Sequence, residues 1–352
     1  MKTKTRILAI DTSCDDTSAS VVEGRVVLSN VIASQTELHK PYGGVFPTVA
    51  KQAHKENINR VIELALKRAQ TKPQQLAAIA VTQGPGLAPA LEVGIRAAEA
   101  FAQEHSLPII PVNHIEGHAL SNLALPKTQL SKKHAQPKFP ALAIIVSGGH
   151  TQFISIPSIG KYEIVGTTLD DAAGECLDKI GRMLHLGYPA GPVIEEFAKQ
   201  GNPKAIEFPL PMTSSGDYNM SFSGLKTFAR NTLEEITKEK ALNKQQIYDF
   251  CASAQYSVFR HIMYKLSKLI EKEKYAEIWL GGGVASNTTL RRMIRETIKP
   301  DGLQLKVPYT RRLNQDNGAM IGIVASYKLE SANENNGTKK IDRKPRWKIE
   351  TK

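Results

Sequence analysis

The sequence lacks the features that would place it in a membrane or a secreted compartment. Its apolar stretches fall short of the roughly 20 residues that a membrane-spanning helix needs. Strand-forming residues follow Met1 almost at once, so we expect no secretory or transit peptide. The 352 residues include only three cysteines, Cys14, Cys176 and Cys251, which lie far apart. An odd and scattered set gives neither a disulfide framework nor a zinc knuckle, so we expect a cytoplasmic protein with free thiols.

Two catalytic motifs are also absent from the sequence. There is no Gly-x-x-x-x-Gly-Lys-Ser/Thr phosphate loop. The protease motif His-Glu-x-x-His is missing too, because Glu116 follows His114 by two residues instead of one. On a helix, that spacing places Glu116 about 200° around the axis from His114. The spacing therefore weighs against a zinc peptidase in which Glu116 is the general base.

Positive charge is present in excess. The sequence has 46 Lys and Arg against 34 Asp and Glu, a formal net charge of +12 at pH 7. Residues 339–352 alone hold seven of these cations against Asp342 and Glu350. A basic surface attracts polyanions such as nucleic acids, although a solvated surface without a partner has the same composition.

One pattern occurs twice in the chain. From Arg6 to Ala33, and again from Ala141 to Thr168, a strand, a polar loop, a second strand, a turn and a third strand follow one another. The length suits about two domains, each with its own core. The duplication predicts an α/β protein of two related lobes that face a cleft, where small ligands usually bind.

The remaining segments complete this domain organisation. We predict an N-terminal lobe of residues 1–120 plus about 310–330, a linker over 121–140 and a C-terminal lobe over 141–309. Residues 331–352 are polar and basic, and we predict that they form a disordered tail. Helical spacing of apolar residues predicts helices at Thr48–Ala69, Pro89–Glu104, Asp171–Leu186, Leu225–Thr237, Gln245–Lys272 and Asn317–Leu329.

His114 and His118 form the first candidate site. If they lie on a helix, the two imidazoles point from one face and can hold one cation. They can equally be two unrelated polar histidines. Asp316 can supply a third ligand, or it can cap the helix that follows it. Two imidazoles and one carboxylate leave coordination positions open for a substrate, as a Lewis-acid centre requires.

Loops after two predicted strands could hold a nucleotide. Residues 147–151 (Ser-Gly-Gly-His-Thr) can form a nest of backbone N–H groups for an anion, or an ordinary hairpin turn. Residues 281–283 are three glycines that let a flat purine approach the backbone, while Ser286 or Asn287 can cap the next helix. Further along lie residues that can hold ribose hydroxyls or be ordinary surface positions, namely Asp178, Gly191 and Glu195.

Six motifs occur together in one order: Thr12-Ser13-Cys14-Asp15, Gly84-Pro85-Gly86-Leu87, His114-Ile115-Glu116-Gly117-His118, Ser147-Gly148-Gly149-His150-Thr151, Ser221-Phe222-Ser223-Gly224-Leu225-Lys226-Thr227 and Asp316-Asn317-Gly318-Ala319-Met320. Between about Ile7 and Tyr327, the chain resembles the bacterial type of the TsaD family, once described as an O-sialoglycoprotein endopeptidase. The resemblance implies the two-lobed actin-like ATPase/Hsp70/sugar-kinase (ASKHA) fold with duplicated RNase H-like subdomains. It also implies transfer of a threonylcarbamoyl group from threonylcarbamoyl-AMP to N6 of adenosine 37 in tRNAs that read ANN codons, with release of AMP.

The same resemblance implies roles for individual residues. It gives His114, His118 and Asp316 as ligands of one divalent metal ion, Fe²⁺ first, with zinc or manganese as alternatives. It gives a substrate loop and nucleotide contacts at Ile145, Val146, Ser147, Gly148, Gly149, Asp178, Gly191, Glu195 and Asn287. An adenine amine is a poor nucleophile, and the candidates for accepting its proton are His150, Asp11 and Asp15.

Several positions depart from the family's common pattern. Asp11 and Asp16 stand where Glu is usual, which keeps a carboxylate of shorter reach. Asn113 replaces a frequent His, Ala190 replaces the first Gly of a Gly-Gly-Pro turn, and Ile145 takes a position that is Tyr in archaeal relatives. None of these changes removes an implied metal ligand.

The implied partners are tRNA, threonylcarbamoyl-AMP, a TsaB-like inactive paralogue and a TsaE-like ATPase, with no membrane partner. Two alternative functions remain open from the sequence. A metal-dependent glycoprotein endopeptidase would use the same histidine pair, and an ASKHA-type kinase or ATPase would share the fold. The histidine pair and the basic charge favour the transferase over the kinase.

Overall fold

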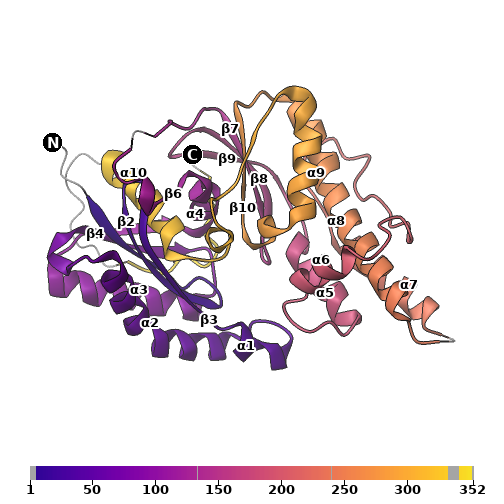
Figure 1. The fold of residues 1–352 in the computed structure, drawn as a ribbon, viewed down its shortest axis with the longest axis horizontal. Helices are drawn as coiled ribbons and strands as arrows, with labels where there is room; N and C mark the ends of the chain where they lie inside the picture. Colours follow the sequence, from indigo (N-terminus) through magenta and orange to yellow (C-terminus); the bar gives the residue numbers. More distant parts are fainter. Residues whose placement is uncertain (1–4, 133, 239, 332–340, 351–352) are drawn as a thin grey trace. The chain divides into compact units, whose positions relative to one another are not determined.

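The computed structural model describes residues 5–132, 134–238, 240–331 and 341–350, which form two compact units (Figure 1). Unit 1 comprises the described residues within Met1–Pro137, Ile159–Lys161 and Val307–Lys352. Unit 2 comprises those within Lys138–Ser158 and Tyr162–Lys306. Each unit contains one mixed β-sheet with helices packed around it.

The sheet of unit 1 has the strand order β5-β4-β1-β2-β3-β6. β1 pairs antiparallel with β2 and parallel with β4, and β2 pairs antiparallel with β3. The strands are β1 (Arg6–Asp11), β2 (Asp16–Glu23), β3 (Val26–Ser34), β4 (Leu76–Gly84), β5 (Ile109–Asn113) and β6 (Leu125–Pro126).

Helices cover both faces of this sheet, because its central strands are apolar on both sides. Leu8 and Ile10 of β1 join a core with α2 and α3, whereas Ala9 between them meets Gly322 of α10. This alternation is the period of two expected of a strand. The helices are α1 (Thr36–His39), α2 (Pro47–Ala69), α3 (Ala88–His105), α4 (His114–Leu120) and α10 (Gly318–Ser331).

The sheet of unit 2 has the strand order β11-β10-β7-β8-β9. β7 pairs antiparallel with β8 and parallel with β10, and all six residues of β7 are buried. The strands are β7 (Ala141–Val146), β8 (Thr151–Ser158), β9 (Lys161–Thr167), β10 (Glu277–Gly281) and β11 (Leu305–Lys306). Its helices are α5 (Ala173–Met183), α6 (Gly191–Ala198), α7 (Ser223–Ile236), α8 (Lys244–Lys272) and α9 (Thr288–Ile298).

The two sheets share one topology, which confirms the predicted duplication. In each, the first strand of a three-strand set lies beside the second strand and also beside a parallel strand from later in the chain. Five strands of unit 1, in the order β5-β4-β1-β2-β3, correspond one by one to β11-β10-β7-β8-β9 of unit 2. The α/β fold with a duplicated core is therefore confirmed.

Two stretches differ from the expected organisation. Within the expected linker 121–140, Leu125–Pro126 pairs with β3 as an edge strand, and the division between the units falls after Pro137. The expected disorder of 331–352 is wrong for Ile341–Glu350. These residues pack on unit 1, and Ile349 is only 6% exposed. Residues 332–340 and 351–352 lie outside the described residues.

The structure also bears on the cysteines and on membrane insertion. Cys14, Cys176 and Cys251 are free thiols, as expected, and the last two are buried. Among the helices of the described residues, none combines the length and apolar character needed to span a membrane.

Candidate functional site

Asn113 starts the short helix that carries the histidine pair. It is the last residue of β5, and its side-chain Oδ1 accepts hydrogen bonds from the backbone N–H groups of Ile115 (2.9 Å) and Glu116 (3.3 Å). A side-chain cap of this kind satisfies donors that the first turn of a helix leaves free. His114 and His118 therefore lie one turn apart on α4, as their spacing predicts, and both are buried.

His114, His118 and Asp316 lie together in unit 1 as a group that could hold a metal ion, here called the metal-ligand group. Oδ1 of Asp316 lies 3.5 Å from Nε2 of His114 and 3.2 Å from Nε2 of His118. The two imidazole rings stand nearly perpendicular, with centroids 4.6 Å apart. One donor atom from each residue lies within 4.8 Å of the others, which is close enough for a shared cation.

The surroundings of His118 fit a metal ligand. The residue is fully buried, yet neither ring nitrogen makes a well-formed hydrogen bond within the described part of the chain. A buried polar atom without a partner is costly, and coordination of a cation satisfies it. Two imidazoles with one carboxylate is a donor set typical of non-haem Fe(II) sites with open positions.

Asp316 was the ambiguous member of this group in the sequence, because it could also cap the following helix. The structure gives that role to its neighbour, since Oδ1 of Asn317 accepts a hydrogen bond from the backbone N–H of Met320 (3.1 Å). The carboxylate of Asp316 is directed instead to the imidazoles, with its side chain 21% exposed. This partial exposure leaves the group accessible from outside.

Asp11 lies beside His114, next to the ring nitrogen that is not directed to Asp316. Its Oδ1 accepts hydrogen bonds from the hydroxyl of Thr82 (2.6 Å) and the backbone N–H of Ser13 (3.3 Å), and lies 3.7 Å from Nδ1 of His114. Asp11 is fully buried at the end of β1. A carboxylate on the second nitrogen of a ligating histidine orients the ring and fixes its tautomer. The geometry therefore suits orientation of His114.

These carboxylates control the charge of the histidine pair. Burial alone would lower the pKa of His114, but Asp316 and Asp11 together outweigh burial and raise that pKa to about 9. Burial lowers the pKa of His118, and the charge on His114 lowers it further. His114 is thus strongly paired with two carboxylates, whereas His118 stays neutral and can donate a lone pair to a metal.

The loop after β1 brings a second acidic cluster against Asp316. Cys14 and Asp15 each offer a donor atom within 4.8 Å of a carboxylate oxygen of Asp316. Burial first, and then Asp316, raises the pKa of Asp15. Burial, followed by Asp15, raises the pKa of Asp16 to about 7. Sequence reasoning gave no role to Asp16, although two adjacent acidic residues after a buried strand were a visible signal.

Glu116 is engaged elsewhere. Its Oε2 lies 3.0 Å from Nζ of Lys328, on α10. The carboxylate is also buried, so it is not poised to activate water at the histidine pair. This agrees with the prediction from helix geometry and weighs against a peptidase in which Glu116 is the general base.

In unit 2, the predicted substrate loop is a tight turn between β7 and β8. The backbone N–H of Ser147 donates to the carbonyl of His150 (2.8 Å), and the N–H of His150 donates to the Ser147 hydroxyl (3.0 Å). Gly148 and Gly149 at its tip are exposed, and a Cβ at either glycine would meet no atom of the described residues within 4 Å. The tip therefore leaves its backbone open to a ligand.

Gly282 brings the loop after β10 against this turn. Its φ is +95°, a conformation that favours glycine, and a Cβ there would overlap the backbone carbonyl of Val146. Gly174, at the start of α5, similarly packs against the carbonyl of Ser147. Ile145 and Val146 are buried at the end of β7, so three backbone segments converge at the substrate loop.

The other predicted nucleotide contacts are anchors within unit 2. Oδ1 of Asp178 accepts hydrogen bonds from the N–H groups of Ala190 (2.8 Å) and Gly191 (3.0 Å). Oε1 of Glu195 accepts from the N–H of Thr288 (2.8 Å). Asn287 caps α9, as the sequence allowed, with Oδ1 accepting from the N–H of Leu290 (3.1 Å). These bonds tie α5, α6 and α9 together near the loop after β10, residues 281–283, here called the glycine loop.

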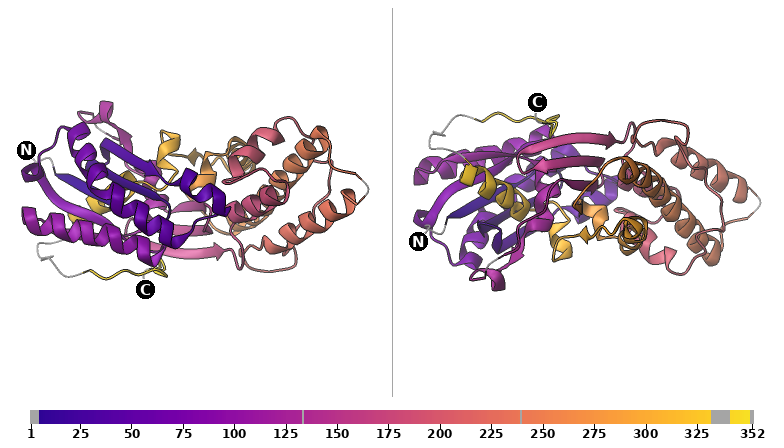
Figure 2. Two further views of the ribbon diagram at one scale, coloured as in Figure 1. Left: turned by 90° about the horizontal axis from the view of Figure 1, so that it is seen from below. Right: turned by 90° about the horizontal axis from the view of Figure 1, so that it is seen from above.

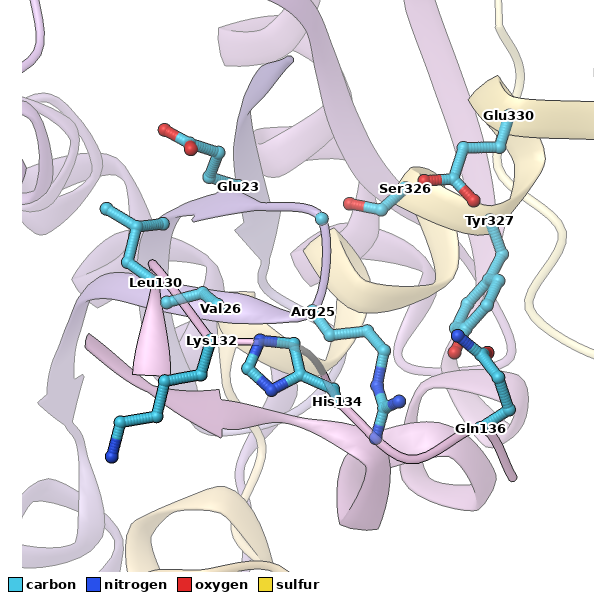
Figure 3. A pocket seen from close by; sticks show the side chains of 11 residues that line it. Glu23, Arg25, Val26, Leu130, Lys132, His134, Gln136, Ser326, Tyr327 and Glu330 are labelled. Atoms are coloured by element: carbon cyan, nitrogen blue, oxygen red, sulfur yellow. The ribbon is translucent and has the colours of Figure 1, made fainter. Parts of the chain in front are cut away.

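A pocket of about 300 Å³ lies elsewhere on unit 1 (Figure 3). It is lined by Glu23 and Arg25 at the β2–β3 turn and by Tyr327 and Glu330 of α10. Glu23 pairs with Arg6 at the start of β1, whereas Asp11 ends that strand. The pocket and the histidine pair therefore lie at opposite ends of β1, roughly 17 Å apart. The pocket contains none of the predicted site residues.

Comparison with known proteins decides the family. The family described as "TsaD: tRNA N6-adenosine threonylcarbamoyltransferase" matches residues 26–323. A tRNA N6-adenosine threonylcarbamoyltransferase of Clostridioides difficile (strain 630) is 45% identical over 323 residues, covering 91% of this chain and 92% of that protein. The chain belongs to the TsaD family. A protein of the same name from Phocaeicola vulgatus is 42% identical, covering 92% of this chain and 94% of its own.

Solved structures give a likeness at the level of the fold. HypF of T. kodakarensis matches 93% of this TsaD chain and 48% of its own length, with a TM-score of 0.60 and 14% identity. Component A of the (R)-2-hydroxyglutaryl-CoA dehydratase of Acidaminococcus fermentans matches 93% of this chain and 100% of its own, with a TM-score of 0.52 and 13% identity. At such low identity the likeness concerns the ASKHA fold alone, which the sequence resemblance predicted.

Proposed function

We propose that this chain transfers the threonylcarbamoyl group of threonylcarbamoyl-AMP to N6 of adenosine 37 in tRNAs that read ANN codons. The observation that carries this proposal is the buried group of His114, His118 and Asp316 in a member of the TsaD family. In the reaction, the amine nitrogen attacks the carbamoyl carbon and forms a new C–N bond. The bond from that carbon to the phosphate oxygen breaks, AMP leaves, and the amine gives up one proton.

We assign one divalent cation, Fe²⁺ first, to His114, His118 and Asp316. The support is the donor set itself, two imidazoles and one carboxylate, together with the unsatisfied nitrogens of His118. When bound, the cation supplies a Lewis acid for the acyl carbonyl. Zinc or manganese would bind the same atoms, so the metal must be identified by analysis of the purified protein.

The protein's own residues would supply orientation and proton transfer. Asp11 would hold the ring of His114 in place, because it is buried and lies 3.7 Å from Nδ1. The candidates for accepting the amine proton are Asp11, Asp15 beside Asp316, and His150 in the substrate loop of unit 2. A carboxyl whose pKa is raised, as that of Asp15 is, holds a proton more readily near neutral pH.

We propose that unit 2 binds the adenylate. The exposed N–H groups at Gly148 and Gly149 would receive the phosphate, as a nest of backbone donors can. The loop from Gly282 to Asn287 would lie against the base, and the turn of Asp178 and Gly191, with Glu195, would lie near the ribose. Ile145, Val146 and Ser147 would form the wall that leads into this loop.

We further propose a cytoplasmic enzyme that works with protein partners, a TsaB-like paralogue and a TsaE-like ATPase. This part of the proposal rests on the family alone. The two units described above are proposed as the N-terminal and C-terminal lobes of the enzyme, with the metal-ligand group in the former and the adenylate loops in the latter.

The test is mass analysis of tRNA nucleosides after incubation of the full chain with threonylcarbamoyl-AMP and an unmodified tRNA that reads an ANN codon. The reaction is run with and without the two partner proteins, and after dialysis against a chelator. We expect threonylcarbamoyladenosine in the complete mixture, and its loss on metal removal with recovery on adding Fe²⁺. Absence of the product in every mixture, with folded protein, would refute the proposal.

A further inference from the structure

The segment Ile341–Glu350, here called the strap, lies along unit 1 with a turn at Pro345–Arg346, and it is yellow in Figure 2. Three hydrogen bonds tie its backbone to the end of β4 and the loop that follows. The N–H of Lys344 donates to the carbonyl of Gln83 (2.7 Å), and the amide of Gln83 donates to the carbonyl of Asp342 (2.7 Å). The N–H of Gly86 donates to the carbonyl of Pro345 (3.2 Å).

The contact between the strap and this loop is backbone against backbone. A Cβ at Gly84 would overlap the carbonyl of Lys344, and one at Gly86 would overlap the carbonyl of Ser13. Both glycines have a φ near +155°, so the loop needs glycine for its conformation as well as for space. The strap is therefore held at a fixed position on unit 1.

The strap contacts the residue that starts the helix of the histidine pair. The amide nitrogen of Asn113 donates to the carbonyl of Trp347 (3.3 Å), and the same side chain caps the helix of His114. The loop of Gly86, whose N–H donates to Pro345, continues to Leu87. The N–H of Leu87 donates to the carbonyl of Ser13 (2.8 Å), in the loop after β1. The strap is therefore in direct contact with Asn113, the residue that precedes His114.

From Pro345 to Glu350, residues of the strap alternate between partly or fully buried and exposed positions. Trp347 is half-buried and Ile349 is buried, while Arg346 and Lys348 are exposed. The Trp347 ring carries the ammonium group of Lys344 4.8 Å from its centroid and that of Lys328 5.9 Å from it. Because Trp347 and Ile349 hold the backbone against unit 1, the Cα positions of Arg346 and Lys348 are fixed.

The strap exposes four cations against two carboxylates, Asp342 and Glu350, so its outward face has a positive excess. Its cations are Arg343, Lys344, Arg346 and Lys348, and all four are exposed. Arg343 is engaged with Glu92 at 2.8 Å. Arginine and lysine side chains on a held backbone are the groups that contact phosphates in nucleic-acid complexes, where they set position and carry no base preference.

We propose that the strap is a phosphate-binding surface for the RNA substrate, with Arg346 and Lys348 as its contacts. Enzymes that act on one base hold that base in the site and contact the flanking nucleotides outside it. A base that reaches His114, His118 and Asp316 brings its flanking phosphates onto the surrounding surface of unit 1, which includes the strap beside Asn113. This inference rests on the proposed function, because it requires that the substrate is an RNA.

The experiment measures binding of an unmodified tRNA transcript that reads an ANN codon to the full chain across a range of salt concentrations. The test variant is R346Q/K348Q, which removes two charges and no anchor. The matched control is R230Q/K238Q, the same change at exposed positions of unit 2. Metal content and melting temperature are recorded for each protein.

Loss of two phosphate contacts should reduce the slope of log K against log salt by about 1.4 to 1.8. The wild-type advantage over the variant should therefore shrink roughly tenfold between about 50 and 200 mM salt. The control should keep the wild-type slope, and both variants should keep their metal and their melting temperature.

A slope and affinity equal to wild type in R346Q/K348Q would overturn the proposal, even if that variant lost binding to a protein partner. Equal losses in the control would overturn it too, because they would reflect total charge. Failure of the proposed function is seen separately, as intact tRNA binding without formation of the modified nucleoside.

Discussion

Asp11 and His114 show how one buried pair can prepare a metal ligand. The carboxylate takes hydrogen bonds from Thr82 and Ser13, so its position is fixed before it meets the imidazole. The other ring nitrogen, Nε2, lies 3.5 Å from Oδ1 of Asp316. The ligand geometry therefore depends on a residue that does not itself belong to the donor set.

We predict that Asp11→Asn weakens metal binding by about 10- to 100-fold, the usual cost of losing an outer-shell carboxylate. The amide keeps the size of the side chain and one acceptor oxygen, but it removes the negative charge that faces Nδ1 of His114. Affinity is measured by competition with a chelator. The control is Asp301→Asn, an exposed carboxyl group of unit 2. Wild-type affinity in Asp11→Asn would mean that His114 needs no orienting partner.

His261 is a second residue whose protonation is set by burial. Burial, and then Lys265, lowers the pKa of His261 to about 4. Its Nε2 accepts a hydrogen bond from the N–H of Ser221 (3.2 Å), which only the neutral ring can do. The fold therefore holds this histidine neutral, at the base of a loop that belongs to one of the six sequence motifs.

This predicts an acid-dependent loss of stability. As the pH falls below about 6.5, the unfolded chain takes up a proton that the folded chain accepts only near pH 4, so the free energy of unfolding falls through that window. The loss is roughly 3 kcal/mol at most. His261→Gln should show a shallower decline across the same window, measured by denaturant unfolding. Parallel pH profiles of the two proteins would contradict the assignment.

At the scale of residues, the sequence selected His114, His118 and Asp316, which the structure brings together, but it left their competing roles open. Spacing alone allowed Asp316 to be a helix cap, and only the structure places Asn317 in that role. Asp178 and Glu195 could equally have been surface charges, and they prove to bind backbone N–H groups. Such choices depend on contacts between distant segments of the chain, which a local pattern does not contain.

At the scale of elements, the glycine loop after β10 depends on a close approach to β7. Gly282 has a positive φ and packs on the carbonyl of Val146, whereas Gly283 beside it has open space. The two adjacent glycines therefore differ sharply in what a methyl group would meet. This contrast gives a paired test of the loop.

We predict that Gly282→Ala lowers the free energy of unfolding by about 1–3 kcal/mol or more, because it combines a strained backbone with a clash. Gly283→Ala should change it by less than about 1 kcal/mol. Both are measured by chemical denaturation. Equal effects of the two substitutions would show that the approach of this loop to Val146 is not a tight one.

Elements whose apolar residues recur at a regular spacing were predictable from the sequence. Elements held in place by contacts with distant segments were not. The helix expected at Thr48–Ala69 is α2, Pro47–Ala69, because its apolar residues recur at helical spacing along the whole length. The strap has no such period, and its basic composition is typical of disorder. Its order comes from Gln83, Gly86 and Asn113, which lie more than 200 residues away in the sequence.

At the scale of the whole molecule, the duplicated strand set predicted the architecture. A repeated order of strand and loop produces two sheets of the same topology, and their central strands are recognisable because a strand buried on both faces is an apolar run. The boundary of the first unit moved to Pro137, since the short pairing of Leu125–Pro126 with β3 leaves little trace in the sequence.

The proposed site residues are distributed over both units. Unit 1 supplies the metal-ligand group, Asp11 and the strap, and unit 2 supplies the substrate loop and the glycine loop. The excess of positive charge, +12 over the chain, agrees with a nucleic-acid substrate. The strap places part of that charge beside Asn113, the residue that precedes His114.

The most direct test of the account is mass analysis of tRNA nucleosides made by His114→Ala beside the wild-type chain, with threonylcarbamoyl-AMP and partner proteins supplied to both. We predict that the variant binds no metal and makes no modified adenosine, while its melting temperature stays close to that of wild type. His105→Ala, at the end of α3, should modify tRNA normally. Modification by His114→Ala at the wild-type rate would contradict the claim that His114, His118 and Asp316 form the reaction centre.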